Sequence, residues 1–413
     1  MYRKLWLLTI MLTILLLSSS LALAAAEGYV GAEACASCHA DHYQGWQTTW
    51  HPEKAGTQKD IYSMAQASWN ELCEGRGNPV VFNADEPTGI TGTRNFELAD
   101  GTKLKNVDGV YIVQTGPLGK HLYVANFYSK GKIIHSMNVT LHTIGRKYRQ
   151  VYNVNLGNND GSHLLKYQFR KDRDYQWNDR NDASVWEKSC ISCHVTGFDI
   201  ATFQTNPNAS IEELSANLGV GCEACHGPGA KHASRPSKNT IVNPANLSPE
   251  RQVDNCAQCH IRGGQNLVYP GYGGALGFQP GDNIYDFFEP IRPNWGTSSR
   301  AVKFDGRAGR GHMTYMDYRL SPKYGVMACT DCHDMHGLNE ERQSLKTSKV
   351  ETCVNCHPGW TEDDINAYMN GQQGWEGDDR GLGMQHTFRL DTEGRVIGLP
   401  ESEWPSENKW PWE

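Results

Sequence analysis

Six C-x-x-C pairs, each followed at once by histidine, use twelve of the 13 cysteines in this 413-residue chain. The cysteines are Cys35, Cys38, Cys190, Cys193, Cys222, Cys225, Cys256, Cys259, Cys329, Cys332, Cys353 and Cys356, and the histidines are His39, His194, His226, His260, His333 and His357. Chance would give roughly 0.02 such pentapeptides at this composition. The spacing is typical of covalent haem c, in which two thiols bind one porphyrin and the adjacent imidazole binds its iron. We therefore expect six covalently bound haems.

Paired cysteines have two other common uses, the zinc ribbon and the disulfide framework. Neither requires a histidine after every pair, and no C-x-x-C in this chain lacks one. The remaining cysteine, Cys73, is most simply a small buried hydrophobic residue, with an intermolecular bond or haem ligation left open. We assign Cys73 no role.

Ten histidines lie outside the motifs, which exceeds the six needed to cap the second face of every haem. A haem with imidazole on both faces only exchanges electrons, whereas an open face can bind a substrate. One iron cannot take two neighbouring imidazoles, so a histidine three residues after a motif is expected to ligate another haem and lock the two together. The candidate distal ligands are His51, His232, His336, His312, His386 and His42.

Residues 1–26 read as a secretory signal peptide, with Arg3 and Lys4 before an uncharged apolar run and small residues for cleavage. An uncleaved anchor is the alternative. We expect an exported protein, periplasmic or at the cell surface, with no stable transmembrane segment after cleavage. The formal charge of −7 and pI near 6.1 argue against a nucleic-acid partner.

The segments between the motifs differ in character. β-branched and aromatic runs between Val110 and Val154, separated by Gly-containing turns, predict strands, whereas 60–74 and 210–218 predict helices, the second with a Ser210/Glu213 capping box. We divide the chain into a first haem-binding segment (27–79), a β-rich insertion (80–170), a three-haem segment (171–265), a Gly/Pro-rich connection (266–328) and a two-haem C-terminal segment with an aromatic tail (329–413).

Several stretches resemble the multihaem cytochromes of the cytochrome c-554 and hydroxylamine-oxidoreductase-like group. They are 31–39 with Trp46 and His51, 219–229, 311–315, 327–337 and 384–388. The resemblance implies a hexahaem member, mainly α with extensive loops wrapped around a chain of packed c-type haems, with His51, His312 and His386 in distal-ligand segments. Two departures are the β-rich insertion between motifs 1 and 2 and the lack of the C-x-x-C-K motif carried by members that reduce nitrite.

Three functions are compatible with these features. The first is a non-enzymatic electron carrier with mostly bis-histidine haems, linking a redox protein donor to an acceptor, with no catalytic residue. The second is an oxidoreductase acting on a small nitrogen or sulfur compound at one open haem, with Arg146, Lys147, His142 or His163 as proton donors or cations. The third is a subunit of an extracellular cytochrome filament that self-associates through haem edges or the aromatic tail 404–412, unless that tail packs on its own chain.

Overall fold

The computed structural model describes residues 28–57, 93–98, 101–115, 122–145, 149–154, 159–170, 176–179, 184–299, 301–309, 313–337, 345–371, 386–393, 395 and 397–413. Several expectations lie outside these residues: the signal peptide, the helix over 60–74, and the positions Cys73, His121, Arg146, Lys147 and His312.

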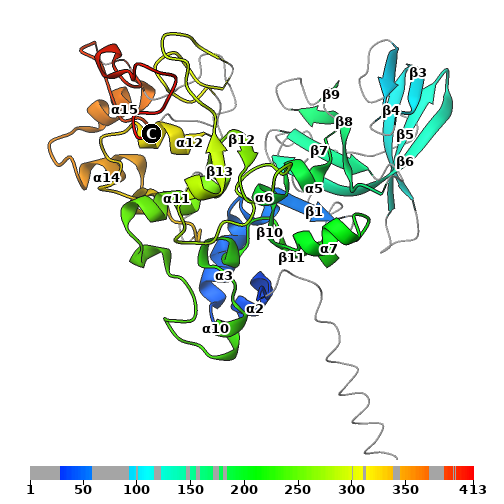
Figure 1. Ribbon diagram of the computed structural model, residues 1–413, viewed down its shortest axis with the longest axis horizontal. Helices are drawn as coiled ribbons and strands as arrows, with labels where there is room; N and C mark the ends of the chain where they lie inside the picture. The colour runs from blue at the N-terminus through cyan, green and yellow to red at the C-terminus, as the bar shows by residue number, and fades with distance from the viewer. Residues whose placement is uncertain are drawn as a thin grey trace, which may run out of the picture.

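A seven-stranded antiparallel sheet occupies much of the chain between the first two motifs (Figure 1). Its strand order is β4-β5-β6-β7-β8-β9, and β1 pairs with β6. The strands are β1 (Ala55–Thr57), β4 (Gly109–Thr115), β5 (Leu122–Ser129), β6 (Lys132–Gly145), β7 (Arg149–Val154), β8 (His163–Arg170) and β9 (Gln176–Asp179), and β2 (Arg94–Glu97) pairs with β3 (Lys103–Val107) beside them. The β-branched runs of the sequence lie in β4 to β7, as their alternation predicts.

The long strand β6 organises the sheet because its two halves have different partners. Its first half pairs with β5, placing Met137 opposite Ala125. Its second half pairs with β7 on one side and with β1 on the other, where Ala55 lies opposite Thr143. The short strand that follows His51 is thereby fixed to the sheet.

The described remainder consists of short helices, small two-stranded sheets and loops, in agreement with the expected helical, loop-rich class. The helices are α2 (Ala32–Ala36), α3 (Ala40–Thr48), α5 (Trp186–Ser189), α6 (Ile191–His194), α7 (Ile200–Thr205), α8 (Ile211–Leu214), α9 (Cys222–His226), α10 (Ala230–Ser234), α11 (Pro249–His260), α12 (Thr314–Arg319), α13 (Cys329–Cys332), α14 (Lys349–Val354) and α15 (Glu362–Gly371). The small sheets pair β10 (Val195–Phe198) with β11 (Ser215–Leu218) and β12 (Gly263–Asn266) with β13 (Phe288–Pro290).

The helix predicted over 210–218 is half right. The Ser210/Glu213 capping box is present and starts α8. The helix ends at Leu214, however, and Ser215–Leu218 turns into β11, where Leu218 lies opposite Val195. Pairing with a strand directly after the second motif overrides the local helical signal.

Two apolar clusters hold the described elements together. One lies between the sheet and helices α5 to α8 and includes Val151, Leu164, Trp186 and Phe203. The other surrounds α11, α12 and the C-terminal tail. Among the described residues no helix is long and apolar enough to cross a membrane.

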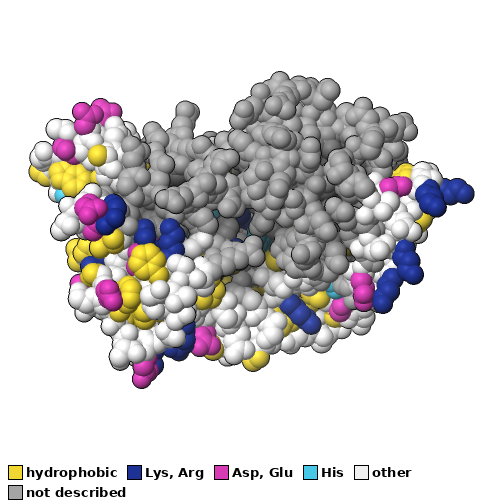
Figure 2. Space-filling view, turned by 90° about the horizontal axis from the view of Figure 1, so that it is seen from above, with side chains coloured by type: hydrophobic (Ala, Val, Ile, Leu, Met, Phe, Trp, Pro, Cys, Tyr) yellow, Lys and Arg dark blue, Asp and Glu magenta, His cyan; other side chains and the backbone are white. Residues whose placement is uncertain are grey.

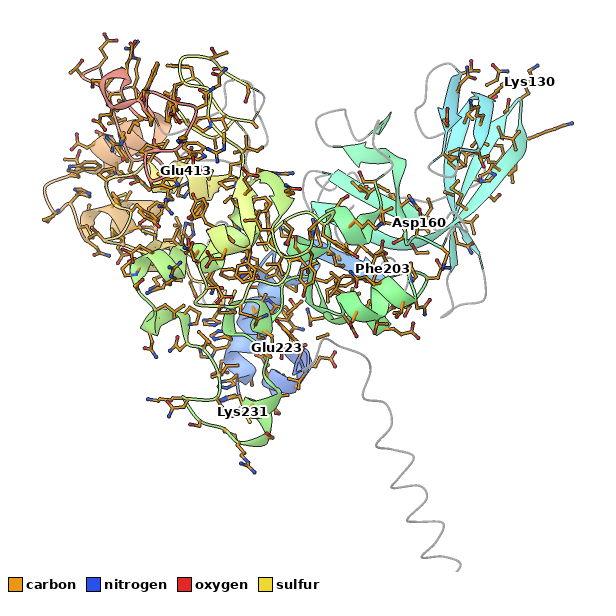
Figure 3. The ribbon with its side chains drawn as sticks, viewed as in Figure 1. Lys130, Asp160, Phe203, Glu223, Lys231 and Glu413 are labelled. Atoms are coloured by element: carbon orange, nitrogen blue, oxygen red, sulfur yellow. The ribbon has the colours of Figure 1, made fainter. Side chains whose placement is uncertain are left out.

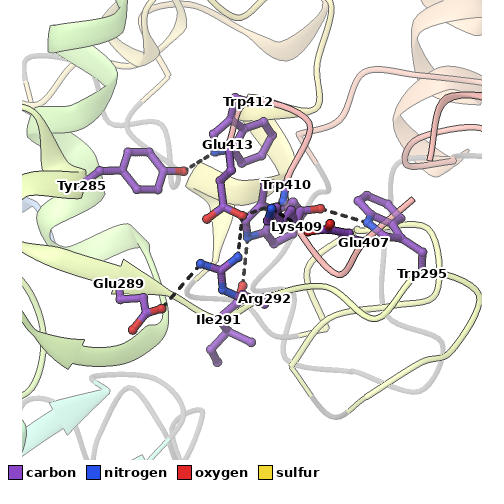
Figure 4. Close-up of polar contacts among 10 residues, drawn as sticks. All are labelled: Tyr285, Glu289, Ile291, Arg292, Trp295, Glu407, Lys409, Trp410, Trp412 and Glu413. Atoms are coloured by element: carbon purple, nitrogen blue, oxygen red, sulfur yellow. Dashed lines mark hydrogen bonds and ion pairs between the residues drawn. The ribbon is translucent and has the colours of Figure 1, made fainter. Parts of the chain in front are cut away.

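The aromatic tail packs on its own chain, which is one of the two alternatives left open by the sequence (Figure 4). Trp410 is 1% exposed, and its indole N–H donates to the Ile291 carbonyl at 3.0 Å. The Trp412 indole donates to the Tyr285 hydroxyl at 2.6 Å. Burial of these rings against 285–295 fixes the end of the chain next to α11 and α12.

Candidate haem centres

The motifs fold as single helical turns. In the first, fifth and sixth motifs the amide of the histidine donates to the carbonyl of the first cysteine at 2.9 Å. One such turn brings the two thiols and the imidazole to the same side. None of the twelve motif thiols is in a disulfide, and only Cys38 and Cys356 are exposed. No cluster of three or more His, Cys, Asp or Glu in the described part of the chain is arranged to hold a metal ion by itself.

Thiols of motifs that are distant in sequence meet in pairs. Cys35 contacts Cys222, linking motifs 1 and 3. Cys193 contacts Cys259, linking motifs 2 and 4, and Cys256 contacts Cys329, linking motifs 4 and 5. Cys332 lies within electrostatic range of Cys353, so motif 6 adjoins motif 5. Motifs 1 and 3 thus form one group and motifs 2, 4, 5 and 6 another. The Gln258 side chain of motif 4 donates to the Ala224 carbonyl of motif 3 at 2.9 Å and connects the two groups.

Three pairs of imidazoles face each other at the same separation. The ring centroids of His39 and His232 are 6.3 Å apart with 22° between the ring planes. His226 and His336 are 6.2 Å apart at 17°, and His333 and His386 are 6.3 Å apart at 31°. Each pair combines a motif histidine with a candidate distal ligand from another segment.

This separation fits one metal ion between two imidazoles. A metal-bound imidazole nitrogen lies about 2.0 Å from the metal and roughly 1.1 Å from its own ring centre, so two imidazoles on opposite faces place their centres about 6 Å apart. Direct stacking would bring the rings closer, as for His357 on Trp360 at 4.5 Å. The donor set and its spacing fit haem iron ligated from both faces.

Hydrogen bonds from one ring nitrogen to a backbone carbonyl orient several imidazoles and set which of their two nitrogens carries the proton. Nδ1 of His226 lies 2.8 Å from the Val242 carbonyl, and Nδ1 of His194 lies 2.7 Å from the Lys54 carbonyl. A carbonyl only accepts, so Nδ1 carries the proton and Nε2 keeps its lone pair. Burial also lowers the pKa of His226, and it lowers the pKa of His51 and His260 to about 4, which favours the neutral, metal-binding form of each.

Glu223, inside the third motif, connects the first and third haem segments (Figure 3). Its carboxylate, 2% exposed, accepts the amides of Val30 at 2.9 Å, Gly31 at 2.8 Å and Gly229 at 2.7 Å. Gly31 precedes the motif of His39, and Gly229 precedes the helix of His232. One carboxylate thus positions both imidazoles of a facing pair. Sequence reasoning missed it, since the acidic residue within a C-x-x-C is the only signal.

A close backbone contact places His336 beside the third motif. Gly337 has φ of +66°, and a Cβ there would collide with the Gly45 carbonyl. Gly45 in turn packs against the His336 carbonyl. Because both positions lack a side chain, α3 approaches the loop after the fifth motif closely enough for His336 to reach His226.

The other candidates differ in placement. His51 is half-buried and lies within electrostatic range of His260. The ring centroids of His42 and His336 are only 4.5 Å apart, too close for a metal ion between them, and the ring 6.3 Å from His42 is that of His39, three residues earlier in the chain. His163, considered above as a proton donor, is 3% exposed with Nε2 3.3 Å from Asp160. The His142 side chain lies outside the described residues.

Family models match two parts of the chain: residues 159–227 match cytochrome c554 and c-prime, and residues 323–360 match a doubled CXXCH motif. The two matches contain motifs 2, 3, 5 and 6, and the motif histidines His226 and His333 each belong to one of the facing pairs. The protein is a multihaem c-type cytochrome. Haem in this class is covalently bound.

Relatives of this multihaem cytochrome carry corresponding names. The multiheme cytochrome MtrA of Shewanella baltica is 24% identical over 180 residues, covering 41% of this chain and 52% of that protein. The C-type polyheme cytochrome OmcC of Geobacter sulfurreducens is 24% identical over 168 residues, covering 38% and 22%. The chain thus matches about half or less of the length of these relatives. The outer cell wall cytochrome OcwA has a similar fold, with a TM-score of 0.51 at 18% identity over 80% of this chain and 67% of that one.

Proposed function

We propose that the chain is an exported hexahaem electron carrier whose haems are mostly capped by histidine on both faces. The observation that supports this most strongly is the set of three imidazole pairs at 6.2–6.3 Å. Haem iron capped on both faces has no position for a substrate, which favours electron exchange over catalysis.

The facing pairs assign ligands to three of the six proposed haems. The haem of Cys35 and Cys38 is held by His39 and His232, that of Cys222 and Cys225 by His226 and His336, and that of Cys329 and Cys332 by His333 and His386. His51 is the proposed distal ligand of the haem of Cys256 and Cys259, opposite His260. The haems of Cys190 with Cys193 and of Cys353 with Cys356 have His194 and His357 as proximal ligands.

Each assigned distal ligand follows a different motif from the one that it serves. His232 follows the third motif and serves the first, and His336 follows the fifth and serves the third. Haem binding would therefore cross-link the chain, and the contacting thiols give a haem order of 1, 3, 4, 5, 6 with haem 2 beside haem 4. Motif 3 is joined to motif 4 by the Gln258 side chain, which donates to the Ala224 carbonyl at 2.9 Å, and Cys225 lies within electrostatic range of Cys256.

Bound haem supplies a one-electron ferric/ferrous couple. The protein's own residues then have three tasks. The motif thiols fix each macrocycle, the paired imidazoles hold the ligand field nearly constant in both redox states, and buried groups such as Trp186, whose ring lies 6.2 Å from that of His194, exclude water. Export to the periplasm or cell surface and exchange with protein donors and acceptors complete the proposal.

Haem stoichiometry and ligand binding test this function. The pyridine haemochrome assay and intact mass should give six covalent haems per chain, and low-temperature EPR should show low-spin ferric haem. Cyanide, nitrite or hydroxylamine should leave the Soret band unchanged. A high-spin signal that disappears on adding nitrite or hydroxylamine would instead support an enzyme with one open haem.

A further inference from the structure

The loop 229–242, which carries His232, has a charge opposite to that of the whole chain. Lys231, Arg235 and Lys238 are all exposed, and none forms an ion pair with the described residues. The sequence contains no Asp or Glu between Glu223 and Glu250. Three unpaired cations therefore occupy one loop of a chain whose formal charge is −7.

The loop lies next to the first haem attachment site, which is itself at the surface. Cys38 is exposed, and His39 faces His232 at 6.3 Å. Figure 3 shows Lys231 at the lower end of the molecule, where side chains project away from the body. A partner bound to the loop would therefore lie beside this haem.

Hydrogen bonds hold the loop in one conformation without using its cationic groups. Its start is fixed by Gly229 donating to Glu223 at 2.7 Å, and its end by Val242, which donates to the His226 carbonyl at 3.1 Å. Within it, the Thr240 hydroxyl donates to the Ser237 carbonyl at 2.7 Å. A preordered charged surface loses little conformational entropy on binding.

The proximal side of the same site has the opposite charge. Glu33 and Asp41 are exposed on α2 and α3, next to the first motif. The three exposed cations thus lie in the loop of the distal histidine and these acidic groups lie beside the motif of the proximal one, which gives an approaching charged protein a preferred orientation.

We propose that the loop 229–242 is the docking site for an acidic redox protein that exchanges electrons at the first haem. The proposal rests on the electron-carrier function above. Because the partner is defined by its negative charge, its affinity falls with ionic strength.

The sheet offers a matched control surface. Lys105, Lys130 and Lys132 are exposed on β3 and around the turn between β5 and β6. Figure 2 shows Lys and Arg side chains gathered at that end of the molecule. Replacing these three lysines with Glu changes the net charge by the same amount as replacing the three loop cations, but far from α10 (Figure 1).

The experiment measures binding of oxidised flavodoxin, an acidic redox protein, to the haem-loaded full chain by calorimetry at low salt. The triple variant Lys231→Glu, Arg235→Glu, Lys238→Glu should bind at least about tenfold more weakly, and the sheet variant should bind nearly as well as wild type. Cationic mitochondrial cytochrome c should not lose affinity for the loop variant.

Two further measurements separate the possible failures. The double variant Arg235→Glu, Lys238→Glu leaves the neighbour of His232 unchanged and should still weaken binding if the triple variant misfolds. Haem count and spin state of the wild type test the carrier function independently of docking. Equal losses in the loop and sheet variants, or no loss in either, would overturn the proposal.

Discussion

At the scale of single residues, the imidazole pairs are the main determinant of spin state. Replacing His232 or His336 with Ala should leave one haem of the set with a single imidazole, while the thioether bonds keep it attached. One high-spin haem should then appear in low-temperature EPR, with its midpoint potential shifted. The control is His135→Ala in β6, whose ring contacts Phe127. An unchanged low-spin spectrum for both distal variants would contradict the ligand assignments.

Glu223 is the residue on which two segments depend. Glu223→Gln removes the charge that accepts three backbone amides and turns an amide N–H toward one of them, so unfolding should become easier by about 2 kcal/mol or more. Guanidinium denaturation of the haem-loaded protein measures this. The exposed Glu212→Gln is the control. Equal stability of the two variants would show that the carboxylate does not connect the segments.

The spacing of the six motifs could be recognised from sequence because covalent attachment requires local residues. The pairing of distal histidines with individual motifs could not be predicted from the sequence, because His232 and His336 reach their partners through contacts made only in the folded chain. Gly45 and Gly337 illustrate this, because they allow the backbones of two segments that are distant in sequence to approach closely. His42 seemed equivalent to His336 by spacing, yet α3 orients it edge-on.

At the scale of elements, the contact between α3 and the loop after the fifth motif depends on space as well as backbone angle. Gly337→Ala should cost about 1–2 kcal/mol for its positive φ, with an added cost for collision with the Gly45 carbonyl. It should also move His336 and raise the high-spin fraction. Gly101→Ala is the control, since φ is +83° there and a Cβ would meet nothing within 4 Å. Equal effects of the two substitutions on spin state would contradict the role of the contact.

The junction between the sheet and α5 should respond to pH. Burial raises the pKa of Glu187, which accepts the Ser162 amide at 3.0 Å. The folded state thus holds the proton more tightly than the unfolded state, so this group's contribution to stability falls as pH rises from its ordinary pKa through the raised one. The free energy of unfolding of the Glu187→Gln variant should therefore rise relative to that of wild type as the pH increases over that range. A difference independent of pH would contradict the assignment.

Element types were predictable where a single local rule applied. Strands β4 to β7 follow from alternation, and α8 starts at its capping box. The end of α8 could not be predicted from the sequence, because β11 forms only when it pairs with β10. The two alternatives for the aromatic tail stayed open for a related reason, since the exposure of Trp410 and Trp412 depends on rings at 285–295.

At the scale of the whole molecule, the proposed haems replace one continuous apolar core, because the described core is divided among the sheet, the cluster beside α5 to α8 and the cluster around α11 and α12. Chain expressed without haem attachment should therefore fail to form a cooperative fold. Circular dichroism and thermal melting of the haem-free chain check this, with the haem-loaded protein as reference. A haem-free chain with the same helical content and a sharp transition would contradict it.

An experimental structure of the haem-loaded protein, with iron located by anomalous scattering, tests the central claim most directly. We expect six iron positions, one between His39 and His232, one between His226 and His336, and one between His333 and His386. Irons at these motifs with other residues, or with no side chain, on their second face would contradict the account.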